Sequence, residues 1–208
     1  MRRILIIGLS AVLVATSAWV AHSATAEPPT GESTTQPHLA PTSPSPSDRL
    51  GLAAQLASAR LATGRYATNL AAAKADGYQI ITRMIPDMGW HFLNPAIQGF
   101  DITKPAILVY ERHRHRWQLA ALEWVFTQPP PSPPLPGATY GSFPAACHYK
   151  DGSLVFARVQ ELCAHHNTGA RFNFWHPDLV TLHLWLWYPN PTGLYNGTNP
   201  YIQPFNHG

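Results

Sequence analysis

The sequence predicts an α+β fold, with one long N-terminal helix packed on a curved, mainly antiparallel β-sheet and a barrel-like closure as an open alternative. Two observations predict this class. Apolar side chains recur at helical spacing between Leu52 and Ala73, and from Tyr78 onward short apolar or alternating runs are divided by turn residues. The pattern therefore places the helix first and the sheet after it, without internal repeats.

The helix is expected to run from residue 48 to about residue 75. Asp48 can cap its first turn, and Gly64 weakens its middle by about 1 kcal/mol relative to alanine. One apolar stripe runs along the surface of this helix. It contains Leu52, Leu56, Ala59, Tyr66, Leu70 and Ala73. Asp76-Gly77 ends the helix, because glycine readily adopts the left-handed conformation there.

The strands are expected where β-forming runs lie between turn residues. They are YQIITRMI (78–85), AILVYE (106–111), WQLAALEWVF (117–126), SLVFAR (153–158), RFNFW (171–175) and LVTLHLWLWY (179–188). The basic segment 111–117 is predicted to be the solvated tip of a hairpin between the second and third of these. The proline-rich segment 128–136 is predicted to be a rigid surface loop, and residues 159–164 a short helical turn.

The N-terminal part of the chain predicts export. Arg2 and Arg3 precede an apolar run, and Ala24-Thr25-Ala26 offers a signal-peptidase site, so residues 1–26 are a predicted signal peptide. The rival interpretation is an uncleaved membrane anchor, for which the uncharged segment is short. Residues 27–48 are expected to be a disordered linker rich in Pro, Ser and Thr, and residues 49–208 a single globular domain. A secreted protein without a stable membrane span follows from these assignments.

The net charge limits the class of partner that is expected, and the two cysteines indicate the redox compartment. Removal of residues 1–26 takes away two arginines and no acidic residue, so the formal net charge falls from +3 to +1. No nucleic-acid partner is expected, because binding to phosphates needs clustered positive charge. Cys147 and Cys163 are predicted to form a disulfide in an oxidising compartment, which stabilises the domain by about 3 kcal/mol.

The last predicted strand has two different faces. Side chains alternate along a strand, so Val180, Leu182, Leu184 and Leu186 share an aliphatic face, and Thr181, His183, Trp185 and Trp187 share the other. A row of exposed tryptophans is unfavourable, so the helix, the proline-rich loop or a ligand is expected to cover the second face. This face therefore predicts a lined cavity.

Other polar residues are candidates for the same site. The loop-like stretch 86–95 carries His91 and Asn94, Glu123 lies among apolar neighbours, and His176 precedes the last strand. Imidazoles and a carboxylate suit a divalent transition metal, so the predicted metal ligands are His91, Glu123, His176 and His183. The predicted ligand pocket contains Trp90, Asn94, Trp185, Trp187 and Asn190. The structural alternative is that His183 and Glu123 are buried groups that bond to backbone or to each other. His148, His165 and His166 are expected at the surface beside the disulfide.

Several segments resemble a known group of proteins. They are ARLATGRYATNLAAAKADGYQ, MGWHFLNPA, KPAILVYE, LAALEWVF and LHLWLWYPNPTGLYNGTNP. In this order they resemble a group of exported bacterial proteins, common among actinobacteria, to which no activity is assigned. The resemblance covers nearly all of residues 50–206. It implies a secreted protein with motif positions at His91, Asn94, Glu123, His183 and Asn190.

Three functions remain open from the sequence. The leading hypothesis is a secreted protein that binds a small ligand or a metal ion in a pocket lined by aromatic and histidine side chains. The second is a metal-dependent enzyme that uses the His/Glu cluster, with Glu123 or Asp87 moving a proton. The third is a structural or cell-surface interaction protein in which the tryptophans are simply packed.

Overall fold

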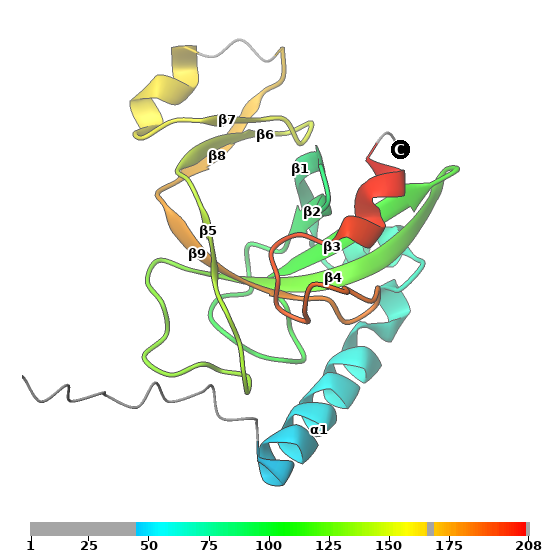
Figure 1. Ribbon diagram of the computed structural model, residues 1–208. Coiled ribbons are helices and arrows are strands. Elements are labelled where there is room, and N and C mark those ends of the chain that lie inside the picture. The colour runs from blue at the N-terminus through cyan, green and yellow to red at the C-terminus, as the bar shows by residue number, and fades with distance from the viewer. Residues whose placement is uncertain (1–44, 166–168, 207–208) are drawn as a thin grey trace, which may run out of the picture. The chain divides into compact units, whose positions relative to one another are not determined.

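The computed structural model describes residues 45–165 and 169–206, and it confirms an α+β fold with a curved antiparallel sheet (Figure 1). The larger sheet has six strands in the order β1-β2-β3-β4-β9-β5, and the smaller sheet has three in the order β7-β6-β8. In the larger sheet the strands are β1 (Gln79–Ile85), β2 (Gly89–Leu93), β3 (Ile107–His113), β4 (Arg116–Phe126), β9 (Leu179–Leu184) and β5 (Gly141–Phe143). In the smaller sheet they are β6 (Ala146–Tyr149), β7 (Leu154–Phe156) and β8 (Phe172–His176).

The first helix begins earlier than predicted. Helix α1 (Pro46–Thr63) has Ser45 as its N-cap, whose Oγ accepts a hydrogen bond from the backbone N of Asp48 at 3.1 Å. The carboxylate of Asp48 accepts in return from the backbone N of Ser45 at 3.2 Å, which completes a capping box. Asp48 is thus the third helical residue, and residues 46–48 belong to the helix instead of the linker. The predicted signal peptide and residues 27–44 of the predicted linker lie outside the described residues.

The helix is also shorter than predicted. It ends at Thr63, and a turn of 3₁₀ helix, η1 (Gly64–Tyr66), follows. A separate helix, α2 (Leu70–Ala75), then begins at Asn69, whose side chain accepts a hydrogen bond from the backbone N of Ala72 at 3.0 Å. The first backbone N–H groups of a helix have no partner within the helix, and the side chain of Asn69 accepts a hydrogen bond from one of them. The local sequence therefore favours two helices over one continuous helix.

The helices cover one face of the larger sheet. Ala59, Tyr66, Leu70 and Ala73 of the predicted stripe are buried, whereas Leu52 and Leu56 are half-buried. They pack in one cluster with side chains of the central strands, among them Leu108, Leu122, Leu182 and Leu184. Of the aliphatic face predicted for the last strand, Leu182, Leu184 and Leu186 are therefore core against the helices, whereas Val180 is half-buried.

The smaller sheet covers the opposite face. The chain passes from β5 into β6 and from β8 into β9, so one edge of the larger sheet continues into the smaller one (Figure 1). At the other edge, the carbonyl of Gly152 accepts a hydrogen bond from the backbone N of Arg83 on β1 at 2.7 Å. Gly152 has φ of +80°, and a Cβ there would lie 2.6 Å from Cδ1 of Ile80. Only glycine permits this close approach, which helps to enclose the space between the two sheets.

Three parts of the sheet differ from the sequence prediction. The stretch expected to be loop-like contains strand β2, which forms a hairpin with β1 across a turn at Asp87, where φ is +61°. Strands β5 and β6 were not predicted. The last strand ends at Leu184 instead of residue 188, because the chain then turns and Leu186 donates a backbone hydrogen bond to Leu184.

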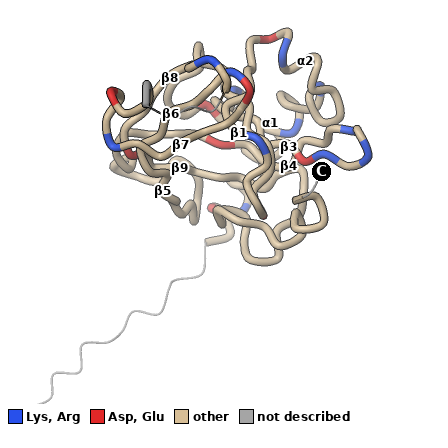
Figure 2. The backbone as a smooth tube through the Cα atoms, turned by 90° about the horizontal axis from the view of Figure 1, so that it is seen from above, with Lys and Arg blue, Asp and Glu red and all other residues tan. Residues whose placement is uncertain are grey.

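Other predicted elements are present. Strands β3 and β4 form the expected hairpin, whose tip gathers the basic residues of segment 111–117 (Figure 2). The predicted disulfide joins Cys147 on β6 to Cys163 in the 3₁₀ helix η2 (Gln160–His165). The remaining 3₁₀ helix is η3 (Pro200–Phe205). Among the described residues, no helix combines the length and the apolar character needed to cross a membrane.

Candidate metal centre

Strand register brings three of the predicted site residues together. Glu123 on β4 is the direct cross-strand partner of His183 on β9 and, on its other side, of Ile107 on β3. Ile107 in turn pairs with Leu93 on β2. His91 lies two residues before Leu93 and thus faces the same side of the sheet. The sheet therefore presents one carboxylate between two imidazoles on its face away from the helices.

The three side chains form a compact cluster. Nε2 of His183 lies 2.8 Å from Oε1 of Glu123, and Nε2 of His91 lies 3.7 Å from Oε2 of the same carboxylate. One potential ligand atom from each residue lies within 4.8 Å of the other two. All three side chains are at most 6% exposed. Two imidazoles and a carboxylate are a common ligand set for zinc and for non-haem iron, and leave coordination positions open.

Thr82 on β1 orients the ring of His91. Irregular register in the β1–β2 hairpin places Thr82 opposite His91, and its Oγ1 lies 2.8 Å from Nδ1 of that ring. The same oxygen accepts a hydrogen bond from the backbone N of His91 at 3.3 Å. When Nδ1 carries the proton and donates to Oγ1, the lone pair of Nε2 faces Glu123. Outer hydrogen bonds of this kind orient imidazole ligands in metal sites.

Burial and charge set the protonation states of the cluster. Burial lowers the pKa of His91 to about 4 and outweighs the attraction of Glu123. Burial alone would raise the pKa of Glu123, but the neighbouring His183 and His91 pull it below its ordinary value. At neutral pH the cluster therefore holds a neutral His91 beside an ionised Glu123. A neutral imidazole and a carboxylate are the forms that bind a metal ion.

His183 is the least satisfied member of the cluster. Its Nε2 contacts the carboxylate of Glu123 at 2.8 Å, and among the described residues its buried Nδ1 has no hydrogen-bond partner. Buried polar atoms are rarely left so, because each costs about 1–3 kcal/mol. Of the structural alternative, in which His183 and Glu123 bond to backbone or to each other, the described residues provide the second part: the two side chains contact each other, and no backbone group bonds to the ring of His183.

A cavity of about 250 Å³ adjoins the cluster, between the two sheets. Its apolar walls include Ile81, Ile107, Val125, Phe143, Phe174 and Leu179. His91 and Glu123 also line it, together with Thr82 and Thr181. The cavity is therefore largely apolar, with polar groups concentrated at the cluster and at a second pair of histidines.

His176 does not join the cluster but pairs with His148. Their Nε2 atoms lie 3.0 Å apart, and both rings line the cavity. The expectation that His148 is a surface residue is wrong: the residue is 1% exposed, and its ring stacks on Phe174 with centroids 4.6 Å apart. The side chains of His165 and His166 lie outside the described residues.

The tryptophans proposed for the pocket are packed elsewhere. Trp185 is buried beside His183, and its Nε1 donates to the carbonyl of Asn196 at 2.6 Å. Trp187 lies on the helix side of the sheet, where its Nε1 donates to Oγ1 of Thr63 at 3.0 Å. Trp90 packs edge-on against Trp117 in the same helix-side core. None of these residues is among those that line the cavity.

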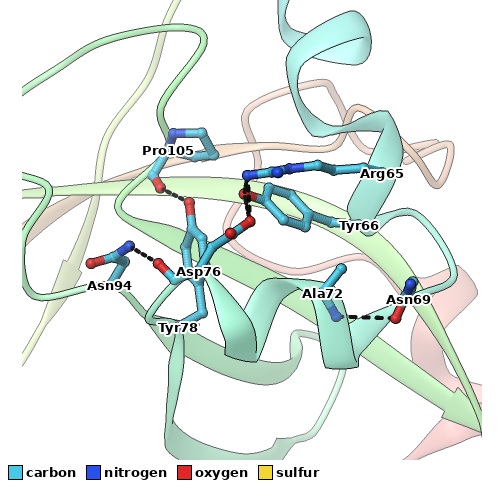
Figure 3. A network of polar contacts seen from close by, with 8 residues as sticks. All are labelled: Arg65, Tyr66, Asn69, Ala72, Asp76, Tyr78, Asn94 and Pro105. Atoms are coloured by element: carbon cyan, nitrogen blue, oxygen red, sulfur yellow. Dashed lines mark hydrogen bonds and ion pairs between the residues drawn. The ribbon is translucent and has the colours of Figure 1, made fainter.

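Asn94 and Asn190, the two asparagines predicted for the ligand pocket, donate hydrogen bonds to backbone carbonyls instead. Asn94 lies near the end of α2, where its Nδ2 donates to the carbonyl of Asp76 at 2.9 Å (Figure 3). Close by, the hydroxyl of Tyr66 donates to the carboxylate of Asp76, which also pairs with Arg65 (Figure 3). Asn190 donates to the carbonyl of Thr198 at 2.9 Å in the C-terminal segment. Asp87 is likewise paired with Asn206, at 3.0 Å, and does not line the cavity.

Comparison of the chain with protein-family models, curated proteins and solved structures gives no significant match. The resemblance to exported actinobacterial proteins therefore stays a prediction.

Some residues of the cavity were not predicted as site residues. The pattern of apolar residues does not identify Thr82, because it depends on an irregular register between β1 and β2. Phe143 lies on the short strand β5, and His148 on β6, which is buried at all four positions and so lacks the alternation that marks a half-exposed strand. Proximity to a cysteine pair was the only local signal for His148.

Proposed function

We propose that the chain is an exported binding protein that holds a divalent transition-metal ion on His91, Glu123 and His183 and takes a small ligand into the adjoining cavity. The observation that carries this proposal is the approach of one ligand atom from each residue to within 4.8 Å of the others, in a buried cluster that borders a cavity. A buried carboxylate between two imidazoles, one of them with a buried Nδ1 that has no partner among the described residues, fits a bound cation better than a packed core.

The ligand set and the cavity suggest what is bound. Two imidazoles and one carboxylate suit zinc, iron, copper or nickel, and disfavour calcium and magnesium, which prefer oxygen ligands. The cavity walls are apolar, and its volume of about 250 Å³ suits a small molecule. The proposed ligand is therefore a small apolar molecule with one oxygen, nitrogen or sulfur group that can reach the metal ion.

Export is part of the proposal and has its own support. The segment expected to be a signal peptide precedes the domain, and the disulfide between Cys147 and Cys163 is compatible with an oxidising compartment. N-terminal sequencing of the protein recovered from the medium of an expressing bacterium tests it. Export predicts a mature chain that begins near Glu27, and a chain retained in the cytoplasm with its first residues intact contradicts it.

The metal part is tested by thermal unfolding of the metal-free protein with zinc, copper, nickel and iron added in turn. Binding to the folded state raises the melting temperature, by mass action, for at least one of these ions. His183→Gln should reduce the increase. His115→Gln, at the exposed tip of the β3–β4 hairpin, is the matched control and should retain it. A wild-type protein whose melting temperature ignores all four ions contradicts the proposal.

A metal-dependent enzyme is the second candidate, and one observation favours it. Three protein ligands, of which His91 and Glu123 line the cavity, leave coordination positions open on the ion, as in catalytic sites. Mass spectrometry of a ligand recovered after incubation with the metal-loaded protein separates the two functions. A binding protein returns the ligand unchanged, whereas an enzyme returns a product whose formation requires Glu123.

A further inference from the structure

The pair His148 and His176 has a geometry that the cluster above does not explain. Nδ1 of His148 lies 2.7 Å from the carbonyl oxygen of Ile81, and Nδ1 of His176 lies 2.6 Å from the carbonyl oxygen of Pro177. A carbonyl oxygen only accepts hydrogen bonds, so each Nδ1 carries a proton and donates it. In the neutral state, the other nitrogen of each ring then has a lone pair and no proton.

Those two lone pairs face each other. The Nε2 atoms lie 3.0 Å apart, a hydrogen-bonding distance without a proton to share while both rings are neutral. Two imidazole nitrogens bound to one tetrahedral zinc ion lie about 3.3 Å apart, given zinc–nitrogen distances of about 2.0–2.1 Å. The observed spacing is therefore close to that of two ligands on one ion.

The surroundings keep both Nδ1 atoms on backbone carbonyls and place the two rings on the wall of the cavity. Phe174 stacks on the ring of His148, and Phe143 lies beside that of His176, so apolar rings flank the pair. In metal sites with such imidazoles, a backbone carbonyl that accepts from Nδ1 fixes the tautomer and the ring orientation.

We propose that His148 and His176 form a second transition-metal site, in which both Nε2 atoms bind one zinc or copper ion on the wall of the same cavity. Water or the ligand in the cavity completes the coordination, because the pair supplies only two protein ligands. The proposal does not depend on the metal centre at His91, Glu123 and His183, since its ligands come from β6 and β8 of the smaller sheet.

Calorimetric titration of the metal-free full chain with Zn²⁺ tests this site, with elemental analysis after desalting. The wild type should bind two equivalents, and His176→Phe should lose one of them. His176 is half-buried and already lies against Phe143, so phenylalanine is tolerated there. Glu123→Gln should keep the His148–His176 equivalent, and His115→Gln should bind as the wild type does. A His176→Phe variant that folds and binds as much zinc as the wild type overturns the proposal.

Nitrogen-15 NMR of the histidine rings gives a second, independent measurement. In metal-free wild type at neutral pH, both rings should carry their proton on Nδ1, and zinc should shift both Nε2 resonances. A proton on either Nε2, with no change on addition of zinc, overturns the proposal. The two metal sites fail separately: loss of zinc binding only in Glu123→Gln contradicts the second site, and loss only in His176→Phe contradicts the first.

Discussion

Nε2 of His183 lies 2.8 Å from Oε1 of Glu123, the residue directly opposite it on the neighbouring strand. Both side chains are almost fully buried, and the second oxygen of the carboxylate faces His91 at 3.7 Å. A buried carboxylate is costly unless cations or hydrogen bonds compensate it. This pairing is therefore central to the proposed metal site, because a metal ion between the three residues would neutralise the charge of the carboxylate and occupy the nitrogen lone pairs.

Thr82→Val should weaken metal binding without unfolding the protein. The substitution removes the oxygen that lies 2.8 Å from Nδ1 of His91, so the imidazole loses its orienting partner. Loss of such a contact lowers metal affinity by about 10–100-fold. Calorimetric titration with Zn²⁺ measures the change. Thr181→Val, on the wall of the same cavity, is the matched control and should keep wild-type affinity; equal losses in both variants would contradict the orienting role.

Trp187→Phe should lower stability and leave metal binding intact. The indole donates a hydrogen bond to Thr63 on α1, and the guanidinium of Arg60 lies 5.4 Å from the centre of the ring. Loss of the hydrogen bond and part of the ring should lower the free energy of unfolding by about 1–2 kcal/mol. Denaturant unfolding measures it. A change in zinc affinity with unchanged stability would place this tryptophan at the site and contradict its assignment to the helix-side core.

Glu111→Gln should stabilise the protein at alkaline pH. Burial raises the pKa of Glu111 to about 7 from 4.5, and among the described residues its Oε2 has no hydrogen-bond partner. The folded state thus binds the proton more tightly than the unfolded state, so wild-type stability falls as pH rises from about 4.5 to 7. The free energy of unfolding of the variant minus that of the wild type should be up to about 3 kcal/mol more favourable to the variant at pH 8 than at pH 4. Unfolding at both pH values tests this, with exposed Glu161→Gln as control.

Removal of the disulfide should destabilise the smaller sheet. The bridge joins residues that are 16 positions apart, and loops of this length contribute about 3 kcal/mol. The Cys147→Ser/Cys163→Ser variant should therefore have a lower melting temperature than the oxidised wild type. Reduction of the wild type with a thiol should give the same loss and should not affect the variant. Equal stability of all forms would show that the bridge contributes nothing.

The sequence predicts what depends on local pattern and misses what depends on register and chain turns. The apolar stripe along α1, η1 and α2, the β3–β4 hairpin and the disulfide follow from spacing and composition. His91, Glu123 and His183 were named as candidates, but only strand pairing brings them together. The last strand ends at Leu184, four residues before the predicted end. Side chains no longer alternate between the two faces beyond that point, so Trp187 lies on the helix side and not beside His183. His148 was misplaced because β6 is buried on both faces.

The most direct test of the metal centre is a crystal of the protein grown with zinc, with diffraction measured on both sides of the zinc absorption edge. The account predicts an anomalous peak about 2.1 Å from Nε2 of His91, from a nitrogen of His183 and from a carboxylate oxygen of Glu123. An ordered cluster at these three residues with no anomalous peak, in a crystal that holds zinc elsewhere, would contradict it.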